Sequence, residues 1–298
     1  MGILPTVDEA LTWRDVHAKD MDAWAPALAV LCREWRLPDG EWERFPFGED
    51  SLVFSRGGVV VKLVPPFLTE DATRELEVLP RLDLPVPSPR VDDVRTIDGW
   101  TAIRMTRLDG VCAAQVWSGL AWTDQSRIMT RIGELLRAIW KTPATDVDPD
   151  PLPAMAALRS EAERHEAAGF EGIQTFLDRA LPVLLPDLRF VHLDLTVENI
   201  MLREQEGRWE LSGVLDFVAS RTTFPPLDLV APGVLFCRGA PMLVRAMLRG
   251  AGLDGFAADE LVAWYLLHPF AEIHRDPARA GQAMDGSLEH RLRQLWRH

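Results

Sequence analysis

The spacing of apolar residues near the start of the chain changes from a helical to an alternating pattern. Residues 20–36, DMDAWAPALAVLCREWR, carry apolar side chains at helical spacing, and the LPDG sequence after them predicts a stop. Residues 42–64 alternate apolar and polar side chains around turns at Gly48 and at 56–58, which predicts three strands. We therefore expect a helix followed by an antiparallel sheet.

The pattern then returns to helix and again to strand. Residues 69–79 have helical spacing and are followed by Pro80, which cannot continue a helix. The prolines of LPVPSPRV, at 84–91, favour an extended chain, and WTAIRMTRL, at 100–108, alternates. Residues 1–107 are thus predicted to form a small, mostly antiparallel sheet crossed by one helix.

The remaining part of the chain, residues 108–298, has mainly helical spacing. Four helical stretches are predicted, at 123–141, 151–181, 239–250 and 256–274. Two strand-like stretches interrupt them, FVHLDLTVENIM at 190–201 and WELSGVLDFVAS at 209–220. The fold class is therefore α+β, with a strand-rich first domain and a larger helical second domain.

Composition excludes several classes of protein. The chain has 298 residues, of which 47% are hydrophobic and 26% charged, as in ordinary globular proteins. It contains no uninterrupted apolar run of roughly 18 residues and no signal-peptide pattern, so neither membrane insertion nor export is expected. The three cysteines are far apart and lack metal-ligand spacing, which favours a reducing cytoplasm.

The net charge of −13 narrows the choice of partner. Nucleic-acid binding requires a basic stripe, and none is present, so we expect no nucleic-acid partner. A cationic small molecule would be attracted instead, although acidity that serves only solubility gives the same charge.

The two strand-like stretches each deliver polar side chains at a strand end. Asp194 and Asn199 form a D-x-x-x-x-N pattern, and Asp216 ends the next apolar run. Carboxylate and amide oxygens suit Mg²⁺, which leaves Asp194 to accept a hydrogen bond from an attacking hydroxyl. The alternative is that these residues merely cap turns, but all three together favour phosphoryl transfer.

Lys62 follows three valines on a predicted strand, where burial of an ammonium group requires a partner. The helix at 69–79 offers Glu75, with Glu77 as a near alternative. The competing interpretation is that the lysine side chain extends from an edge strand to solvent.

Two further features allow two interpretations each. The turn from Gly48 to Ser51 either faces a phosphate through its amides and hydroxyl or is an ordinary hairpin. His192 either holds the loop through a hydrogen bond, which we favour, or exchanges protons during the reaction.

Taken together, these motifs resemble the aminoglycoside phosphotransferase family. Its H-G-D-x-x-x-x-N loop is similar to HLDLTVEN, its metal-binding D-F-G aspartate to LDFV, and its strand lysine to VVVKL. The likeness covers residues 20–275, and WAPALAVLCREWRLP and AWYLLHPFAEI resemble hygromycin-type kinases. It implies a protein-kinase-like bilobal fold, with a nucleotide-binding lobe at 1–107 and a catalytic lobe at 108–298.

The resemblance also implies roles for single residues. MTRLDG is similar to the family's hinge, which places backbone groups of Thr106 and Leu108 at the adenine, and the family pattern selects Glu75 as the partner of Lys62. Asp228 is similar to the aspartate that braces the catalytic loop.

The chain departs from the family pattern around the loop. Leu193 replaces a glycine, Val218 replaces the third residue of D-F-G, and residues 223–224 replace a Gly-Asp pair. Residues 196–198 replace His-Pro-Gly, which adds the carboxylate of Glu198 near the expected chemistry.

The resulting expectation is an ATP- or GTP-dependent O-kinase that uses Mg²⁺. Asp194 would act on the acceptor hydroxyl, Asn199 and Asp216 would hold the metal, and Lys62 would hold the phosphates.

The expected acceptor is an aminoglycoside or aminocyclitol, with Glu198, Glu272 and Asp276 as contacts for its ammonium groups. The alternatives are a metabolite kinase acting on a sugar or amino alcohol and a regulatory nucleotide-binding module. We expect a monomer or homodimer.

Overall fold

The computed structural model describes residues 2–7, 10–46, 50–143, 151–279 and 287–296 of the chain. The protein forms two compact units. Unit 1 comprises Met1–Arg81 and Ser88–Leu108, and unit 2 comprises Leu82–Pro87 and Asp109–His298. Within the described ranges, every helix is too short or too polar to cross a bilayer.

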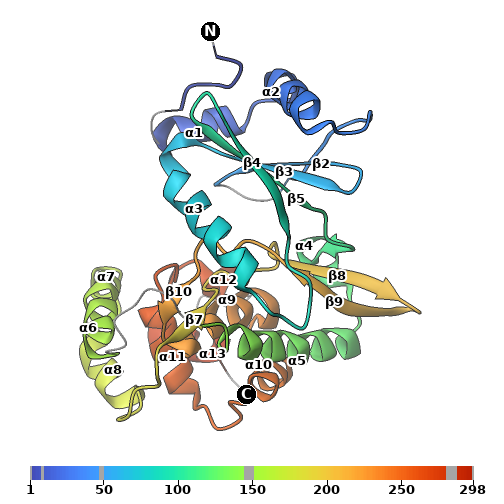
Figure 1. The fold of residues 1–298 in the computed structure, drawn as a ribbon. Helices are drawn as coiled ribbons and strands as arrows, with labels where there is room; N and C mark the ends of the chain where they lie inside the picture. The colour runs from blue at the N-terminus through green and yellow to red at the C-terminus, as the bar shows by residue number, and fades with distance from the viewer. Residues whose placement is uncertain (1, 8–9, 47–49, 144–150, 280–286, 297–298) are drawn as a thin grey trace. The chain divides into compact units, whose positions relative to one another are not determined.

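Unit 1 is built on an antiparallel sheet with the strand order β1-β2-β3-β5-β4 (Figure 1). Its strands are β1 (Glu43–Arg44), β2 (Leu52–Arg56), β3 (Val59–Val64), β4 (Val91–Ile97) and β5 (Trp100–Thr106). The central strand β3 pairs with β2 on one side and β5 on the other. The alternating pattern at 42–64 and 100–108 thus forms the predicted sheet.

Helices cover both faces of this sheet. In Figure 1, α2 (Met21–Trp35) lies on one face and α3 (Thr69–Val78) on the other. The first face is packed by aromatic and aliphatic side chains from α2 and from α1 (Ala10–His17), a helix that the apolar spacing did not predict. Because side chains alternate along a strand, Val61 faces α2 while Val60 and Val64 face α3. Lys62 shares the α3 face by the same alternation.

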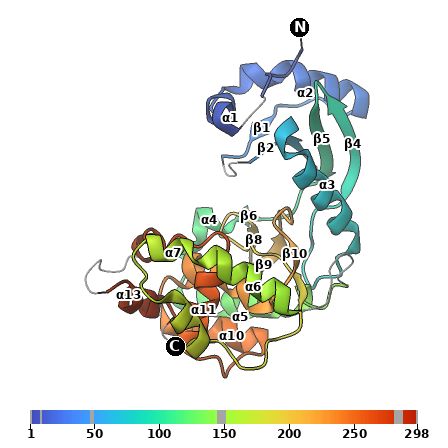
Figure 2. The same cartoon turned by 90° about the vertical axis from the view of Figure 1, so that its left-hand side faces the viewer.

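The core of unit 2 contains two long helices that lie side by side, α5 (Trp122–Ile139) and α10 (Pro241–Ala251) (Figures 1 and 2). They approach closely because glycine stands at the contact on both helices. A Cβ at Gly133 would overlap the Met247 carbonyl oxygen, and one at Gly250 would overlap the Thr130 carbonyl oxygen. The two glycines therefore set the distance between α5 and α10 in the core of unit 2.

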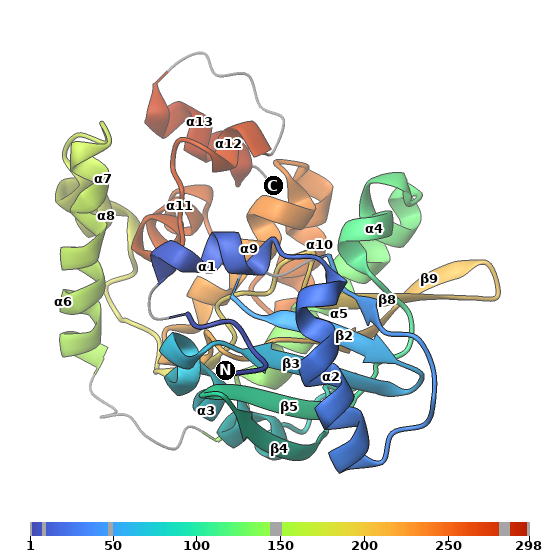
Figure 3. The ribbon, with the colours of Figure 1, turned by 90° about the horizontal axis from the view of Figure 1, so that it is seen from above.

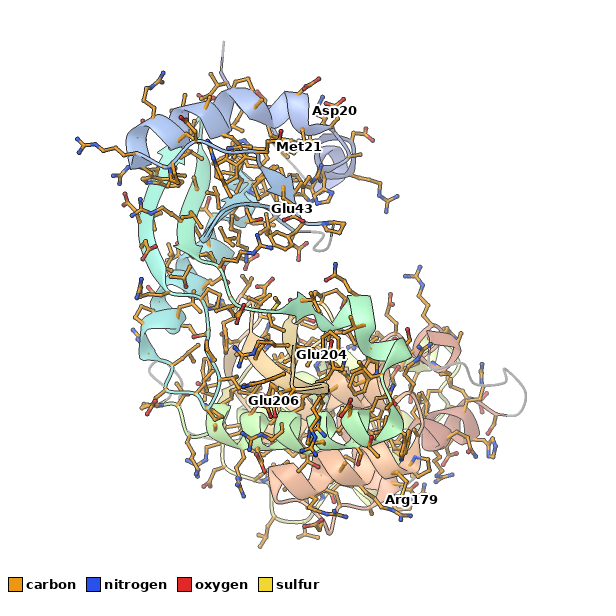
Figure 4. All side chains as sticks on the ribbon, turned by 90° about the vertical axis from the view of Figure 1, so that its right-hand side faces the viewer. Asp20, Met21, Glu43, Arg179, Glu204 and Glu206 are labelled. Carbon is orange, nitrogen blue, oxygen red and sulfur yellow. The ribbon has the colours of Figure 1, made fainter. Side chains whose placement is uncertain are left out.

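Two small sheets carry the predicted catalytic residues. One has the order β6-β8-β9 and the other pairs β10 with β7. Their strands are β6 (Val111–Cys112), β7 (Arg189–Val191), β8 (Ile200–Gln205), β9 (Arg208–Val214) and β10 (Arg221–Thr223). Figure 4 labels Glu204 and Glu206 near the turn of the β8–β9 hairpin, where Glu206 adopts a φ of 53°.

The remaining helices surround these sheets. They are α4 (Ala113–Val116), α6 (Pro151–Ala162), α7 (Arg164–Ala167), α8 (Ile173–Ala180), α9 (Val230–Pro232), α11 (Ala258–Leu267), α12 (Asp276–Arg279) and α13 (Leu288–Leu295). Figure 3 shows α6, α7 and α8 grouped at one side of the unit. Short 3₁₀ segments occupy Pro66–Leu68, Leu79–Arg81, Trp117–Gly119 and Pro225–Leu229, and a π-helical turn occupies Gly233–Cys237.

Two helix predictions were wrong in their extent. The stretch at 151–181 is divided into three helices, and Gly169 and Gly172 separate α7 from α8 because their φ values of 94° and 68° do not fit an α-helix. The helix expected at 256–274 ends at Leu267, two residues before Pro269.

Candidate active site

In unit 1, Lys62 and Glu75 form a buried ion pair. The Lys62 Nζ atom lies 2.7 Å from Glu75 Oε2, and only 8% and 3% of the two side chains are exposed. The strand alternation directs Lys62 toward α3, and Glu75 is one of the two buried residues of that helix. The pairing chosen from the sequence is therefore the one that the structure contains, and the Lys62 side chain does not extend to solvent.

The other predicted nucleotide contacts of unit 1 lie at strand ends. Ser51 is buried directly before β2, while Gly48 lies outside the described residues. The Thr106 N–H donates to the Arg90 carbonyl oxygen at 3.0 Å, so this amide is engaged within the unit. Leu108 is half-buried, and its backbone groups make no hydrogen bond within the described ranges.

In unit 2, the loop 192–199 joins β7 to β8 and brings Asp194 next to Asn199. The Asn199 Nδ2 group donates to the Asp194 carbonyl oxygen at 2.8 Å and to its Oδ2 atom at 3.0 Å. The Thr196 N–H donates to the same carbonyl oxygen at 2.9 Å. The bonds to the carbonyl oxygen hold the Asp194 backbone, and the bond to Oδ2 orients its carboxylate; the residue is half-buried.

Pairing between β8 and β9 brings Asp216 to the same loop. Ile200 is opposite Val214 in the ladder, and the Leu215 N–H donates to the Asn199 carbonyl oxygen at 2.9 Å. Because Leu215 directly precedes Asp216, this bond holds the backbones of the two predicted metal ligands together. The three residues selected from the sequence therefore belong to one cluster.

The His192 side chain joins the backbones of Asp194 and Leu215 through hydrogen bonds. Its Nδ1 atom accepts from the Asp194 N–H at 3.2 Å, so Nε2 carries the proton and donates to the Leu215 carbonyl oxygen at 3.0 Å. Burial lowers the pKa of His192 to about 4, and its ring packs against Phe217 with 4.5 Å between centroids. A neutral, fully buried imidazole with both nitrogens engaged acts as a brace.

Leu193 adopts a left-handed backbone conformation, with a φ of 65°. Such a conformation costs an ordinary L-residue roughly 1–2 kcal/mol, which accounts for the glycine in the family motif. Here the strained backbone is held at both ends. The Leu193 N–H donates to Asp228 Oδ1 at 2.6 Å, and its carbonyl oxygen lies 3.1 Å from His268 Nε2.

Asp228 is the buried anchor of the loop. Its Oδ2 atom accepts from the His192 N–H at 3.1 Å and from Trp140 Nε1 at 2.9 Å, in addition to the bond from Leu193. Burial raises the pKa of Asp228 to about 6, while the three N–H donors act in the opposite direction. The bracing role implied for Asp228 by the family resemblance is confirmed.

The donor set near Asp216 fits a magnesium ion. Asn199 Oδ1 accepts no hydrogen bond in the described part of the chain, because the amide nitrogen is the atom that faces Asp194. The Asp216 residue adopts a φ of 60°, and its Oδ1 atom accepts a long bond from the Val218 N–H at 3.4 Å. Mg²⁺ takes few protein ligands, so an amide oxygen and a carboxylate are a sufficient donor set.

The three acids expected to meet the acceptor differ in their surroundings. Glu198 is half-buried within the loop itself. Glu272 pairs with Arg275 at 2.9 Å and retains 37% side-chain exposure. Asp276 instead lies inside the unit, where its Oδ2 atom accepts from the Tyr265 hydroxyl at 2.8 Å and from the Glu272 N–H at 2.9 Å. This carboxylate organises the chain before α12 and is not presented at the surface.

Sequence reasoning missed residues that act on the loop from a distance. His268 belongs to no motif found in the sequence, yet it contacts Leu193 across 75 positions of sequence. Trp140 also lies outside the motifs, and its hydrogen bond to Asp228 spans 88 positions. The Cys112 thiol contacts the Val197 and Glu198 carbonyl oxygens at 3.3 Å, and burial raises its pKa to about 11. No local motif marks any of these residues.

Comparison with known proteins now identifies the family. The model of the phosphotransferase enzyme family, APH, matches residues 41–265. The chain belongs to the phosphotransferase enzyme family. The matched range includes Lys62 and Glu75 of unit 1 and the loop 192–199, Asp216 and Asp228 of unit 2. The match confirms the prediction that the chain is a phosphotransferase. No curated protein sequence matches the chain.

Solved structures of family members share the fold at low sequence identity. An APH(2") enzyme in complex with GDP and kanamycin has a TM-score of 0.63 at 14% identity, with 80% of this chain and 86% of that chain covered. A thermostable mutant of aminoglycoside phosphotransferase APH(4)-Ia, with ADP and hygromycin B, has a TM-score of 0.60 at 15% identity, covering 89% and 97%. Macrolide 2'-phosphotransferase MphH from Brachybacterium faecium has a TM-score of 0.55 at 19% identity, covering 88% and 99%. The predicted bilobal, kinase-like α+β fold of this phosphotransferase is confirmed.

Proposed function

We propose that this phosphotransferase moves the γ-phosphoryl group of ATP or GTP to a hydroxyl of a small cationic molecule, with an aminoglycoside or aminocyclitol as acceptor. The observation that carries the proposal is the cluster of Asp194, Asn199 and Asp216. The hydrogen bond from the Leu215 N–H to the Asn199 carbonyl oxygen, at 2.9 Å, holds an acid, an amide and a second acid in one place.

Asp194 is the proposed catalytic base. The acceptor hydroxyl donates to its carboxylate, the hydroxyl oxygen forms a bond to the γ-phosphorus, and the bond to the β–γ bridging oxygen breaks. The proton passes to Asp194 as the new bond forms, and the nucleoside diphosphate leaves. The amide of Asn199 supports this role, because it orients Asp194 Oδ2 from 3.0 Å.

Asn199 Oδ1 and the Asp216 carboxylate would hold Mg²⁺. When bound, the ion would supply positive charge to the phosphate oxygens. His192, Leu193 and Asp228 do no chemistry in this proposal. They keep the loop in a single conformation, which matters because phosphoryl transfer depends chiefly on positioning and charge.

In unit 1, Lys62 would contact the α- and β-phosphates, with Glu75 fixing its ammonium group through the 2.7 Å ion pair. Ser51 and the turn that includes Gly48 would cover the phosphates. Backbone groups at Thr106 and Leu108 would meet the base, and the Leu108 amide, which donates to no described residue, is the better donor. ATP and GTP both suit this description, since related structures contain ADP or GDP.

Two observations support the proposed class of acceptor: the ligands bound in related structures and the negative net charge of this chain. Kanamycin and hygromycin B are present in two of the related structures. The net charge of −13 favours a cation, and Glu198 and Glu272 are the proposed contacts for its ammonium groups. Three free cysteines suit the reducing cytoplasm, where ATP and GTP are available.

The test is nucleotide turnover with Mg²⁺ and either ATP or GTP against a panel of acceptors. The panel contains kanamycin, hygromycin B, a macrolide, simple sugars and amino alcohols. We expect turnover with an aminoglycoside or aminocyclitol and its loss in the Asp194→Ala variant. Asp254→Asn, which removes an exposed acid after α10, is the matched control.

Two results would contradict the proposal in different ways. Turnover with a sugar, amino alcohol or macrolide alone would overturn the acceptor class and leave the reaction intact. Wild-type turnover in Asp194→Ala would overturn the assignment of the base itself.

A further inference from the structure

Unit 2 contains a cavity of about 580 Å³ that the proposed reaction does not use. It lies at the end of α5 and is bordered by residues 186–190, by Pro225 and Pro226 and by the connection after α10. Its size is within the roughly 300–1,000 Å³ of ligand pockets. None of the residues proposed for phosphoryl transfer lines it, so it is a separate candidate binding site.

The charged side chains at this cavity are all cationic. Arg137, Lys141 and Arg189 line it, and no acid is among the described lining residues. Arg137 and Lys141 are exposed and form no ion pair with any described residue, while Arg189 pairs with the exposed Asp187 at 2.8 Å. In a chain with a net charge of −13, Arg137 and Lys141, which pair with no acid among the described residues, make a local site for an anion.

Most of the other residues that line the cavity are apolar. Trp140, Phe190 and Phe256 contribute aromatic rings, and Pro225 and Pro226 contribute rigid aliphatic surface. We propose that the cavity binds a small organic anion, whose aromatic or flat aliphatic body packs against these side chains. Its carboxylate or phosphate group would lie at Arg137 and Lys141.

A ligand in this cavity would contact the support of the catalytic loop. Trp140 both lines the cavity and donates to Asp228 Oδ2 at 2.9 Å. The same Asp228 carboxylate accepts the N–H groups of His192 and Leu193. Packing on Trp140 therefore acts on the residue that fixes the loop, and this inference does not depend on which acceptor the enzyme uses.

The binding test compares three probes of similar shape by calorimetry: 1-naphthoate, 1-naphthylmethanol and 1-naphthylmethylamine. We expect the carboxylate to bind about tenfold more tightly than the neutral alcohol, and the amine most weakly, because charge-assisted hydrogen bonds favour the anion. The Arg137→Gln/Lys141→Gln double variant should bind the carboxylate no better than the alcohol. Arg245→Gln/Arg249→Gln, which removes two exposed charges from α10 outside the cavity, should keep the wild-type preference.

Equal affinity for all three probes, or a carboxylate preference that survives in Arg137→Gln/Lys141→Gln, would overturn the anion site. If none of the three probes binds, the anion site is overturned as well. The link to the loop has its own measurement, amide hydrogen exchange at His192 and Leu193. Saturating naphthoate should slow this exchange in the wild type but not in Trp140→Phe, and unchanged exchange in the wild type would overturn the link.

Discussion

At the scale of single residues, His268 makes stability depend on pH. Burial lowers the pKa of its imidazole from 6.5 to about 3 in the folded protein, where Nε2 donates to the Leu193 carbonyl oxygen. The unfolded chain therefore binds more protons than the folded one below about pH 6.5. The stabilisation from the neutral imidazole is complete above pH 6.5 and is lost as the pH falls toward 3.

The matching prediction concerns His268→Gln, since glutamine presents an uncharged N–H near the position of Nε2. Between pH 7 and pH 5 the wild type should lose about 2 kcal/mol more free energy of unfolding than this variant. Urea unfolding at the two pH values measures the difference, and the exposed His274→Gln serves as control. Equal losses in wild type and His268→Gln would show that this imidazole does not titrate on unfolding.

The Lys62–Glu75 pair gives a second prediction at this scale. Removing one partner of a buried ion pair typically costs about 3–5 kcal/mol, because the other charge stays buried. Glu75→Ala should therefore destabilise unit 1 strongly, and the same change should cost less in a Lys62→Met background. Urea unfolding of the four proteins of this double-mutant cycle measures the coupling. Additive effects would contradict an energetic link between the two side chains.

At the scale of elements, the contact between α5 and α10 depends on glycine. Alanine is the better helix former by about 1 kcal/mol, so propensity alone predicts that Gly133→Ala stabilises α5. The structure predicts the opposite, a loss of about 3 kcal/mol, because the new Cβ would overlap the Met247 carbonyl oxygen. Thermal or urea unfolding decides between them.

Gly255→Ala is the control for this change, since a Cβ there meets no atom within 4 Å. It should leave the unfolding midpoint nearly unchanged. A Gly133→Ala variant as stable as Gly255→Ala would contradict the close packing of the two helices.

The elements also show what the sequence was able to predict. Asp194, Asn199 and Asp216 were found because a short loop and one strand pairing join them, and both leave local patterns. Lys62 was found from the strand pattern, whereas the family resemblance was needed to select Glu75 over Glu77 on the following helix. These relationships extend over few residues, where periodicity dictates which side chains share a face.

The features that the sequence did not predict depend mainly on contacts between segments that are far apart in the chain. His268 and Trp140 reach the loop from elements far along the chain, so no spacing rule connects them to it. The separation of α7 from α8 arises at two glycines with positive φ, and the presence of a glycine in the sequence does not reveal which φ it adopts. Asp276 was expected to contact the acceptor, but its bonds to Tyr265 and Glu272, which no local pattern predicts, place it inside the unit.

At the scale of the whole molecule, the net charge of −13 gives a prediction about rate. A cationic acceptor is drawn to an acidic protein, and dissolved salt screens this attraction over a Debye length of about 10 Å at 0.1 M. The kcat/KM for a cationic acceptor should fall several-fold as ionic strength rises, while that for a neutral sugar should change little. Steady-state kinetics at low and high salt measure both values, and equal salt dependence would argue against electrostatic recognition.

The central claim is that the loop 192–199 and Asp216 form a phosphoryl-transfer centre. The most direct test measures transfer of the labelled γ-phosphate of ATP or GTP to the acceptor, in the presence of Mg²⁺, by the wild type, Asp216→Asn and the control Asp254→Asn. We predict transfer by the wild type and the control, and a loss of about 10³-fold or more in Asp216→Asn, whose amide is a weaker metal ligand than a carboxylate. Wild-type transfer by Asp216→Asn would contradict the account.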